Sequence, residues 1–143
     1  MLIKKDELVI RHAEAADVQN KSQVLFCSDD TFQLLITEVD GKPAGEMNFS
    51  NMGNKTAQLG IIINDASMRN KGYGTRFLSM LIEHLLMVLG YEKIILDVAF
   101  DNRRARHVYE KLGFREKRIK HESNVVDYEL TREEFLSRST GGY

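Results

Sequence analysis

The stretch that decides the fold is Arg69-Asn70-Lys71-Gly72-Tyr73-Gly74, which directly precedes the strongest helical pattern of the chain, at residues 75–90. Two glycines separated by one residue let the backbone fold tightly enough for successive N–H groups to point inward. The helix that follows adds the positive end of its dipole. The stretch therefore predicts an anion cradle, most simply for a phosphate, and the alternative interpretation is an ordinary glycine turn.

Two familiar phosphate-binding motifs do not fit this stretch. The dinucleotide fingerprint needs a third small residue where Phe77 stands, and it belongs in the first strand–helix turn of a parallel sheet. The nucleoside-triphosphate loop needs Gly-Lys followed by Ser or Thr, which this sequence does not contain. Both kinds of nucleotide site are therefore set aside.

Outward from the cradle, apolar runs and turn residues predict a series of strands and helices. Strands are expected at residues 8–10, 32–39, 44–49, 58–63, 93–99, 114–120 and 125–130, and helices at 13–20, 75–90 and 102–112. Asp40-Gly41 is suited to a tight hairpin turn. The unbroken apolar run at 59–63 is typical of a strand covered on both faces. This order predicts a mixed α/β sheet with helices on both faces.

Length and composition favour one domain over residues 1–136 of the 143, followed by a flexible tail at 137–143. The single Cys27 excludes an intramolecular disulfide and a multi-thiolate metal site, and the four histidines show no metal-ligand spacing, so no metal is expected. The N-terminus becomes charged early, and the longest apolar stretch, 77–90, is shorter than the ~20 residues of a membrane helix. A cytoplasmic protein with no membrane partner is expected.

The formal net charge of -1 conceals a polarised chain, because residues 103–120 include eight basic and two acidic residues. That segment carries +6 and the remainder -7. A solvated face is one interpretation, and attraction of a phosphorylated ligand is another. Nucleic-acid binding is not favoured, because no aromatic interleaving or known module accompanies the charge. The acidic remainder favours a cationic partner.

Two motifs together indicate a family. The cradle matches Arg/Gln-x-x-Gly-x-Gly/Ala before a long amphipathic helix, and residues 102–114 match Asn-x-x-Ala-x-x-x-Tyr-x-x-x-Gly-Phe. The sequence thus resembles the GNAT superfamily of N-acetyltransferases, and within it the branch of ribosomal-protein N-terminal and spermidine acetyltransferases. The resemblance implies a mostly antiparallel central sheet of six to seven strands. It also implies direct transfer of an acetyl group from acetyl-CoA to a primary amine of a protein N-terminus, a lysine, a polyamine or another small molecule, in a ternary complex.

The same resemblance implies which residues bind acetyl-CoA. The cradle amides would hold the pyrophosphate, the end of the strand at 58–63 would offer backbone groups to the pantetheine arm, and Asn102 would lie beside that arm. A helix N-cap is an equally good role for Asn102. The implied cofactor-binding residues are Ile61, Ile62, Ile63, Arg69, Asn70, Lys71, Gly72, Tyr73, Gly74, Thr75, Asn102, Ala105 and Tyr109.

For catalysis, the resemblance implies that Tyr109 protonates the departing thiolate as general acid. The alternative interpretation of Tyr109 is a tyrosine of the hydrophobic core. The general base is left open. Many relatives carry Glu where Gln58 stands, and an amide cannot accept the proton of a protonated amine. Glu46 and Asp97 are candidate bases, with a water chain or bulk solvent as alternatives, and Gln58 is expected only to position the acceptor.

The amide at Gln58 also keeps a second function open, a non-catalytic acyl-CoA-binding or partner-binding module of the same fold. The short segment at 14–30, where relatives often shape the acceptor site, predicts either an open site or one completed by a second subunit in a homodimer. A protein terminus would suit the open version.

Overall fold

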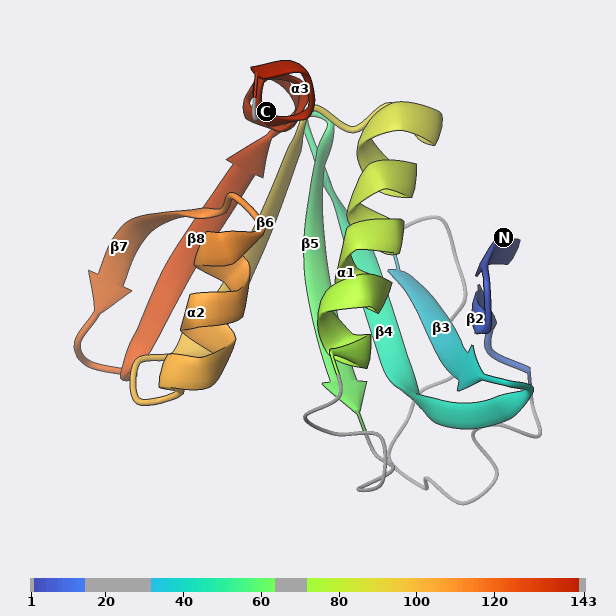
Figure 1. The fold of residues 1–143 in the computed structure, drawn as a ribbon. Helices are drawn as coiled ribbons and strands as arrows, with labels where there is room; N and C mark the ends of the chain where they lie inside the picture. The colour runs from blue at the N-terminus through green and yellow to red at the C-terminus, as the bar shows by residue number, and fades with distance from the viewer. Residues whose placement is uncertain (1, 15–31, 64–71, 142–143) are drawn as a thin grey trace. The chain divides into compact units, whose positions relative to one another are not determined.

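The computed structural model describes residues 2–14, 32–63 and 72–141, and over these ranges eight strands form one mixed sheet (Figure 1). The strands are β1 (Leu2–Lys5), β2 (Leu8–His12), β3 (Phe32–Val39), β4 (Lys42–Gly53), β5 (Thr56–Ile63), β6 (Lys93–Ala99), β7 (Arg115–Lys120) and β8 (Val125–Thr131). The helices are α1 (Tyr73–Glu83), the π-helix η3 (His84–Val88), α2 (Arg103–Lys111) and α3 (Arg132–Gly141). The strand order is β1-β2-β3-β4-β5-β6-β8-β7.

The predicted mixed, mostly antiparallel sheet is confirmed. Strands β5 and β6 run parallel, whereas the pairs β1–β2, β2–β3, β3–β4, β6–β8 and β7–β8 are antiparallel. The sheet has eight strands instead of six to seven, because the edge strand β1 was not predicted. That strand has only four residues, three of them exposed, so it leaves no hydrophobic periodicity to detect.

The chain forms two compact units, of which the first comprises Met1–Asn51 and Leu59–Glu83. In this unit α1 buries one apolar face and contacts β1 and β2. The buried residues of α1 are Phe77, Leu78, Met80, Leu81 and Ile82. Arg76, on the same helix, forms an ion pair with Glu7 at 2.6 Å. Burial of apolar surface therefore attaches α1, and the ion pairs of Arg76 with Glu7 and Asp6 orient it.

The second unit comprises Met52–Gln58 and His84–Tyr143. Its core lies on one face of β6 and β8, where alternate residues are buried: Ile94, Leu96, Val98, Val126, Tyr128 and Leu130. Helix α2 has no buried residue. Figure 1 shows α2 beside β8, to which Arg106 is joined by a hydrogen bond with Tyr128 at 3.0 Å.

The helix predicted over residues 75–90 is confirmed in its first part and differs at its end. Helix α1 stops at Glu83, and η3 continues with one extra residue in the turn, closed by the Leu89 N–H on the His84 carbonyl at 3.0 Å. Gly90 then takes a left-handed φ of +82°, as expected for a helix end. The wider turn leaves Val88 and Leu89 exposed, although both belong to the apolar stripe of the sequence.

Helix α3 contains the start of the predicted flexible tail, since residue 137 lies inside it. Its N-terminus is a capping box: the Thr131 N–H donates to Glu134 Oε1 at 3.0 Å, and the Glu134 N–H donates to the Thr131 hydroxyl at 3.1 Å. Although burial raises the pKa of Glu134, hydrogen bonds from Thr131 and the Arg115 charge leave that pKa below its ordinary value. The division at residue 136 stays a prediction.

Some predictions concern residues outside the described ranges. These are most of the helix at 13–20, the acceptor-shaping segment at 14–30, Cys27, and Arg69, Asn70 and Lys71 of the cradle. The prediction of helices on both faces depends partly on the first of these and stays a prediction. In the part of the chain that the structure describes, no helix is long and apolar enough to span a membrane.

Candidate active site

The described part of the cradle is the start of α1. Gly72 is exposed with a φ of +81°, and a Cβ added there meets nothing within 4 Å. The positive φ of Gly72 therefore requires glycine, and the described residues do not crowd this position. The Gly72 carbonyl accepts the N–H of Arg76 at 3.1 Å, so Gly72 directly caps the helix.

The first turn of α1 is Tyr73, Gly74 and Thr75, and it contains no acidic residue. The N–H groups of a first helical turn have no acceptor within the helix, and the dipole makes that end electropositive. The first turn of α1 thus offers N–H donors of the right sign for an anion. Which ligand they bind stays a prediction.

The predicted pantetheine strand is the end of β5, where Ile61 is half-buried and Ile62 and Ile63 complete the strand. One neighbouring feature was not predicted. A Cβ added to Gly60 would meet Asn48 Nδ2 of β4 at 2.9 Å, so the Asn48 amide occupies the space that a side chain on β5 would need. The sequence signal for this close approach is the glycine that interrupts an otherwise β-branched and leucine run.

On α2, the N-cap interpretation of Asn102 is confirmed. Its side-chain oxygen accepts the N–H of Ala105 at 3.1 Å, which satisfies one of the free donors of the first turn. Ala105 is half-buried on the same turn. The roles of both residues toward the pantetheine arm stay predictions.

Tyr109 lies in an aromatic cluster in the second unit. Its ring centroid is 6.0 Å from that of Phe114, with an interplanar angle of 63°, and 6.2 Å from that of Tyr128, with an angle of 54°. The side chain is half-buried, and burial raises the pKa of its phenol above the ordinary value. The phenol therefore keeps its proton at neutral pH, which suits a proton donor and excludes a resting phenolate base.

The Tyr128 ring that contacts Tyr109 belongs to a polar network that the sequence does not predict. The Tyr128 hydroxyl, buried beneath α2, donates to Glu110 Oε2 at 2.7 Å and accepts from Arg106 Nε at 3.0 Å. Arg106 also donates to Glu116 Oε1 at 2.9 Å. The only local signal is that Arg106 and Glu110 are four residues apart and flank Tyr109 on the helix.

Gln58 lines a pocket of about 280 Å³ in the second unit. The residues that line it are Gln58, Ile95, Leu96, Asp97, Lys117, Lys120, Asp127, Tyr128 and Glu129. Of the two candidate bases, Asp97 is therefore in the same pocket as Gln58. Glu46 is not among the lining residues; it lies in β4, opposite Ile36 of β3, and is half-buried. A catalytic role for Glu46 stays a prediction.

Two carboxyl groups of this pocket affect each other. Asp97 and Asp127 lie directly opposite in the antiparallel β6–β8 pair. The pKa of Asp97 is raised, first by its hydrogen bond with Asp127, then by burial and by the neighbouring negative charge. Burial opposes the ionisation of Asp127, but hydrogen bonds with Asp97 and Lys120 and the nearby cations leave the pKa of Asp127 below its ordinary value.

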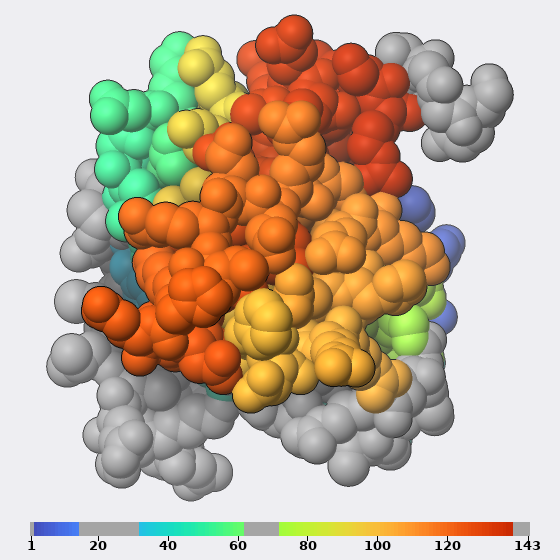
Figure 2. All heavy atoms as spheres, turned by 90° about the vertical axis from the view of Figure 1, so that its left-hand side faces the viewer, coloured from blue at the N-terminus to red at the C-terminus, as the bar shows by residue number. Residues whose placement is uncertain are grey.

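Ion pairs offset part of the positive charge of the basic segment at residues 103–120. Figure 2 shows the surface formed by α2 and β7, coloured yellow to orange. The cations of β7 form ion pairs with the acidic residues of β8: Lys120–Asp127 at 3.3 Å, Arg118–Asp127 at 3.5 Å and Lys117–Glu129 at 3.6 Å. These pairs offset part of the positive charge locally.

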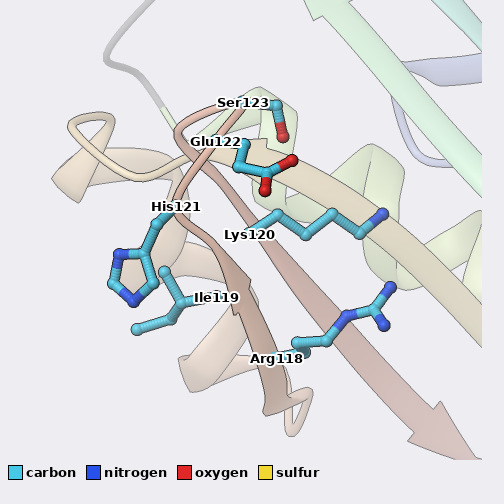
Figure 3. Close-up of a pocket in the computed structure, with 6 residues that line it drawn as sticks. All are labelled: Arg118, Ile119, Lys120, His121, Glu122 and Ser123. Atoms are coloured by element: carbon cyan, nitrogen blue, oxygen red, sulfur yellow. The ribbon is translucent and has the colours of Figure 1, made fainter.

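A second concavity, of about 550 Å³, lies at the β7–β8 turn, lined by residues 118–123. Figure 3 shows the side chains of Arg118 and Lys120 extending to one side of β7, while Ile119 and His121 point to the other. The turn itself thus collects no set of converging acids or nucleophiles. Among the described residues, no group of three or more His, Cys, Asp or Glu side chains could hold a metal ion.

Comparison with known proteins gives three findings. The profile described as the acetyltransferase (GNAT) family matches residues 4–114. Spermidine N(1)-acetyltransferase of Escherichia coli strain K12 is 33% identical over 88 residues, which are 60% of this chain and 47% of that protein. The homologous protein of Escherichia coli O157:H7 gives the same values. The chain therefore spans about half the length of the curated relatives it matches.

Solved structures show the same fold. A dodecameric structure of spermidine N-acetyltransferase from Vibrio cholerae, in an intermediate state, superposes with a TM-score of 0.82 at 20% identity, covering 93% of this chain and 98% of the other. A structure of that enzyme in complex with CoA and spermine gives a TM-score of 0.78 at 19% identity, covering 91% and 98%. At this level of identity the likeness concerns the fold.

Proposed function

Because this chain belongs to the acetyltransferase (GNAT) family, we propose that it transfers the acetyl group of acetyl-CoA to a primary amine. The observation that carries the proposal is the state of Tyr109, a half-buried phenol with a raised pKa in the motif that the family match includes. A phenol that keeps its proton is what the departing thiolate needs. The N–H groups at the start of α1 support the same proposal, because a helix N-terminus with no acidic residue in its first turn suits the pyrophosphate of the co-substrate.

The acceptor class that we favour is a polyamine. The curated relatives act on spermidine, and the Vibrio cholerae enzyme binds spermine. In this chain the pocket at Gln58 is lined by three acidic side chains and two lysines, and Asp97, whose carboxyl forms no ion pair among the described residues, provides a hydrogen-bond acceptor for an ammonium group. Protein N-termini, lysine side chains and other small amines are the competing acceptors. The homodimer stays a prediction; the Vibrio cholerae relative is dodecameric.

Different residues of this chain would perform the separate steps of the reaction. Acetyl-CoA supplies the acetyl group as a thioester. Backbone N–H groups at the start of α1 bind its phosphates, and Gln58 orients the amine in the pocket. The amine must lose a proton before it attacks, since a free alkylamine with a pKa near ~10.4 is mostly protonated at pH 7. Tyr109 donates its phenolic proton to the departing sulfur and regains one from solvent.

The test is an acceptor panel with mass-spectrometric detection of the product and release of free thiol from acetyl-CoA. We expect acetylation of spermidine or spermine, and a decrease in kcat of about 10²- to 10⁴-fold in Tyr109→Phe, the usual contribution of a general acid. Calorimetry should show nearly unchanged affinity of that variant for acetyl-CoA. Wild-type kcat in Tyr109→Phe across pH would contradict the general-acid role. Binding of acetyl-CoA with no acetylated product on any acceptor would instead favour the non-catalytic module.

A further inference from the structure

The pocket at Gln58 contains cations of the protein as well as carboxyl groups. Strand β7 contributes Lys117 and Lys120 to its lining. An acceptor that enters the pocket as an ammonium ion therefore meets two ammonium groups that are already there. The negative charge open to the acceptor depends on how the carboxyl groups of the pocket are paired.

A β-bulge in β7 aims these cations at one face of the sheet. The register of β7 against β8 shifts just before Arg118, so Lys117 is an extra residue on its strand. In a regular strand, consecutive side chains point to opposite faces. Here Lys117 Nζ lies 3.6 Å from Glu129, and Arg118 Nη2 lies 3.5 Å from Asp127, two residues away on β8 and on the same face. Figure 3 shows Lys120 extending to the same side of β7 as Arg118.

Two of the three carboxyl groups of the pocket form ion pairs with cations of the chain. Lys120 Nζ lies 3.3 Å from Asp127 Oδ1. Glu129 lies 3.6 Å from Lys117 Nζ on β7 and 3.4 Å from Lys93 Nζ on β6. The Asp127 and Glu129 side chains are only 22% and 19% exposed, so water screens these pairs incompletely. Both carboxylates are therefore partly neutralised before an acceptor arrives.

The field of the same cations reaches Asp97, the carboxyl of the pocket that forms no ion pair among the described residues. The pKa of Asp97 is raised, first by its hydrogen bond with Asp127, but the Lys120 and Arg118 charges oppose that rise. A positive potential that stabilises a carboxylate also repels a further cation beside it. One ammonium group of the acceptor can pair with Asp97, whereas a second one meets carboxylates that already have cationic partners.

We propose that Lys117 and Lys120 are specificity-determining residues that limit the pocket to one ammonium group of the acceptor. This inference rests on the proposed acetyltransferase function and describes which amines its pocket accepts. A polyamine then inserts one terminal amine and keeps its other cationic centres outside the pocket. Without the two lysines, Asp127 and Glu129 would be open to ammonium groups of the acceptor, and acceptors with several closely spaced charges would gain most.

The kinetic test compares butylamine with putrescine, which has the same four-carbon chain and a second amine at its other end. The measured quantity is kcat/KM for putrescine divided by kcat/KM for butylamine. We expect Lys120→Met to raise this ratio by up to about 5-fold, the usual range of a partly exposed ion pair, and the double variant Lys117→Met, Lys120→Met to raise it further. Methionine keeps the apolar stem of lysine and removes the charge.

Two further variants separate the pocket charges from the total charge of the protein. Arg115→Met is the matched control, because Arg115 lies on the same strand but pairs with Glu134 of α3, at 2.8 Å, and does not line the pocket. It should leave the ratio unchanged. Lys120→Arg keeps the charge and should retain the wild-type ratio. An unchanged ratio in the double variant, or an equal rise in Arg115→Met, would overturn the inference.

Calorimetry in the presence of CoA, which carries no acetyl group to transfer, measures the same preference without turnover. The affinity for putrescine should increase more in the double variant than the affinity for butylamine. Equal changes for the two amines, or no binding of either amine to the wild-type protein, would contradict the role of Lys117 and Lys120. The expected affinity pattern with no acetylated product on any amine would contradict the acetyltransferase function alone.

Discussion

Helix α1 begins within one family motif and α2 lies within the other, yet the two helices are attached to the sheet by different forces. Helix α1 buries five apolar side chains and has only exposed or half-buried polar contacts, such as the Arg76–Glu7 ion pair. Helix α2 buries none and is held by its Asn102 cap and by hydrogen bonds of Arg106 and Glu110 with Tyr128.

The difference has consequences for the candidate site. Apolar burial is not directional, so the position of α1 depends mainly on the volume and shape of its buried side chains. Hydrogen bonds depend on distance and angle, so the network at Tyr128 fixes α2, and with it Tyr109, in one orientation. For the proposed general acid Tyr109, this directional attachment keeps the phenol in one orientation, whereas the proposed anion-binding amides at the start of α1 need only a stable core.

The largest expected effect is on the apolar attachment of α1. Leu81 is fully buried, and Leu81→Ala should lower the free energy of unfolding by about 2–5 kcal/mol, because the favourable burial of the deleted methyl groups is lost and a cavity remains. Denaturant unfolding measures this change. Ser79→Ala, at an exposed position of the same helix, is the control and should change stability by less than about 0.5 kcal/mol. Equal losses in both variants would show that burial does not hold α1.

A smaller effect is expected from the polar attachment of α2. Tyr128→Phe keeps the ring and removes the hydroxyl, which leaves Arg106 and Glu110 without a buried partner, at a cost of about 1–3 kcal/mol. Because these hydrogen bonds fix the helix that carries Tyr109, kcat should also fall while acetyl-CoA affinity does not change. His107→Ala, on an exposed position of α2, should affect neither quantity. Unaltered stability in Tyr128→Phe would mean that the network does not fix the helix.

The smallest effect is expected at the cap of α2. Asn102→Ala removes the acceptor for the Ala105 N–H and should cost about 1 kcal/mol, whereas Asn102→Ser, which retains a cap, should cost much less. The pair of variants also separates the two roles of Asn102. If Asn102 contacts the co-substrate, Asn102→Ser keeps its stability and loses acetyl-CoA affinity in calorimetry; if the cap is its whole role, that affinity is retained.

Much of the fold could be predicted because its signals are local. Strands β3 and β6 have the predicted bounds, since continuous or alternating apolar runs between turn residues leave few other interpretations. The ends of elements were harder. The π turn after Glu83 buries Leu85 and Leu86 just as a regular helix would, so the sequence pattern does not distinguish the two. The capping box at Thr131 is visible in the sequence, but the chain after it has little amphipathic pattern, and α3 was not predicted.

The candidate site also has features that could be predicted from the sequence and features that could not. Gly72 and the N-cap role of Asn102 follow from residue type and position, because positive φ and capping are properties of short segments. The partner of Asp97 could not be predicted, because Asp127 is thirty positions away and a one-residue shift in register would place it on the other face of the sheet. The contact of Tyr128 with α2 could not be predicted for the same reason, because the strand pairing decides on which face of the sheet Tyr128 lies.

The sequence by itself determined the family, the α/β composition, the glycine before α1 and the tyrosine on α2, since these depend on motifs that a few consecutive residues define. Only the tertiary structure decided which of the candidate bases lies in the same pocket as Gln58, which cations pair with Asp127, and which rings contact Tyr109. The physical reason is range. Backbone preferences act over one helical turn, whereas charges and hydrogen bonds act on whichever groups the strand register brings within a few ångströms.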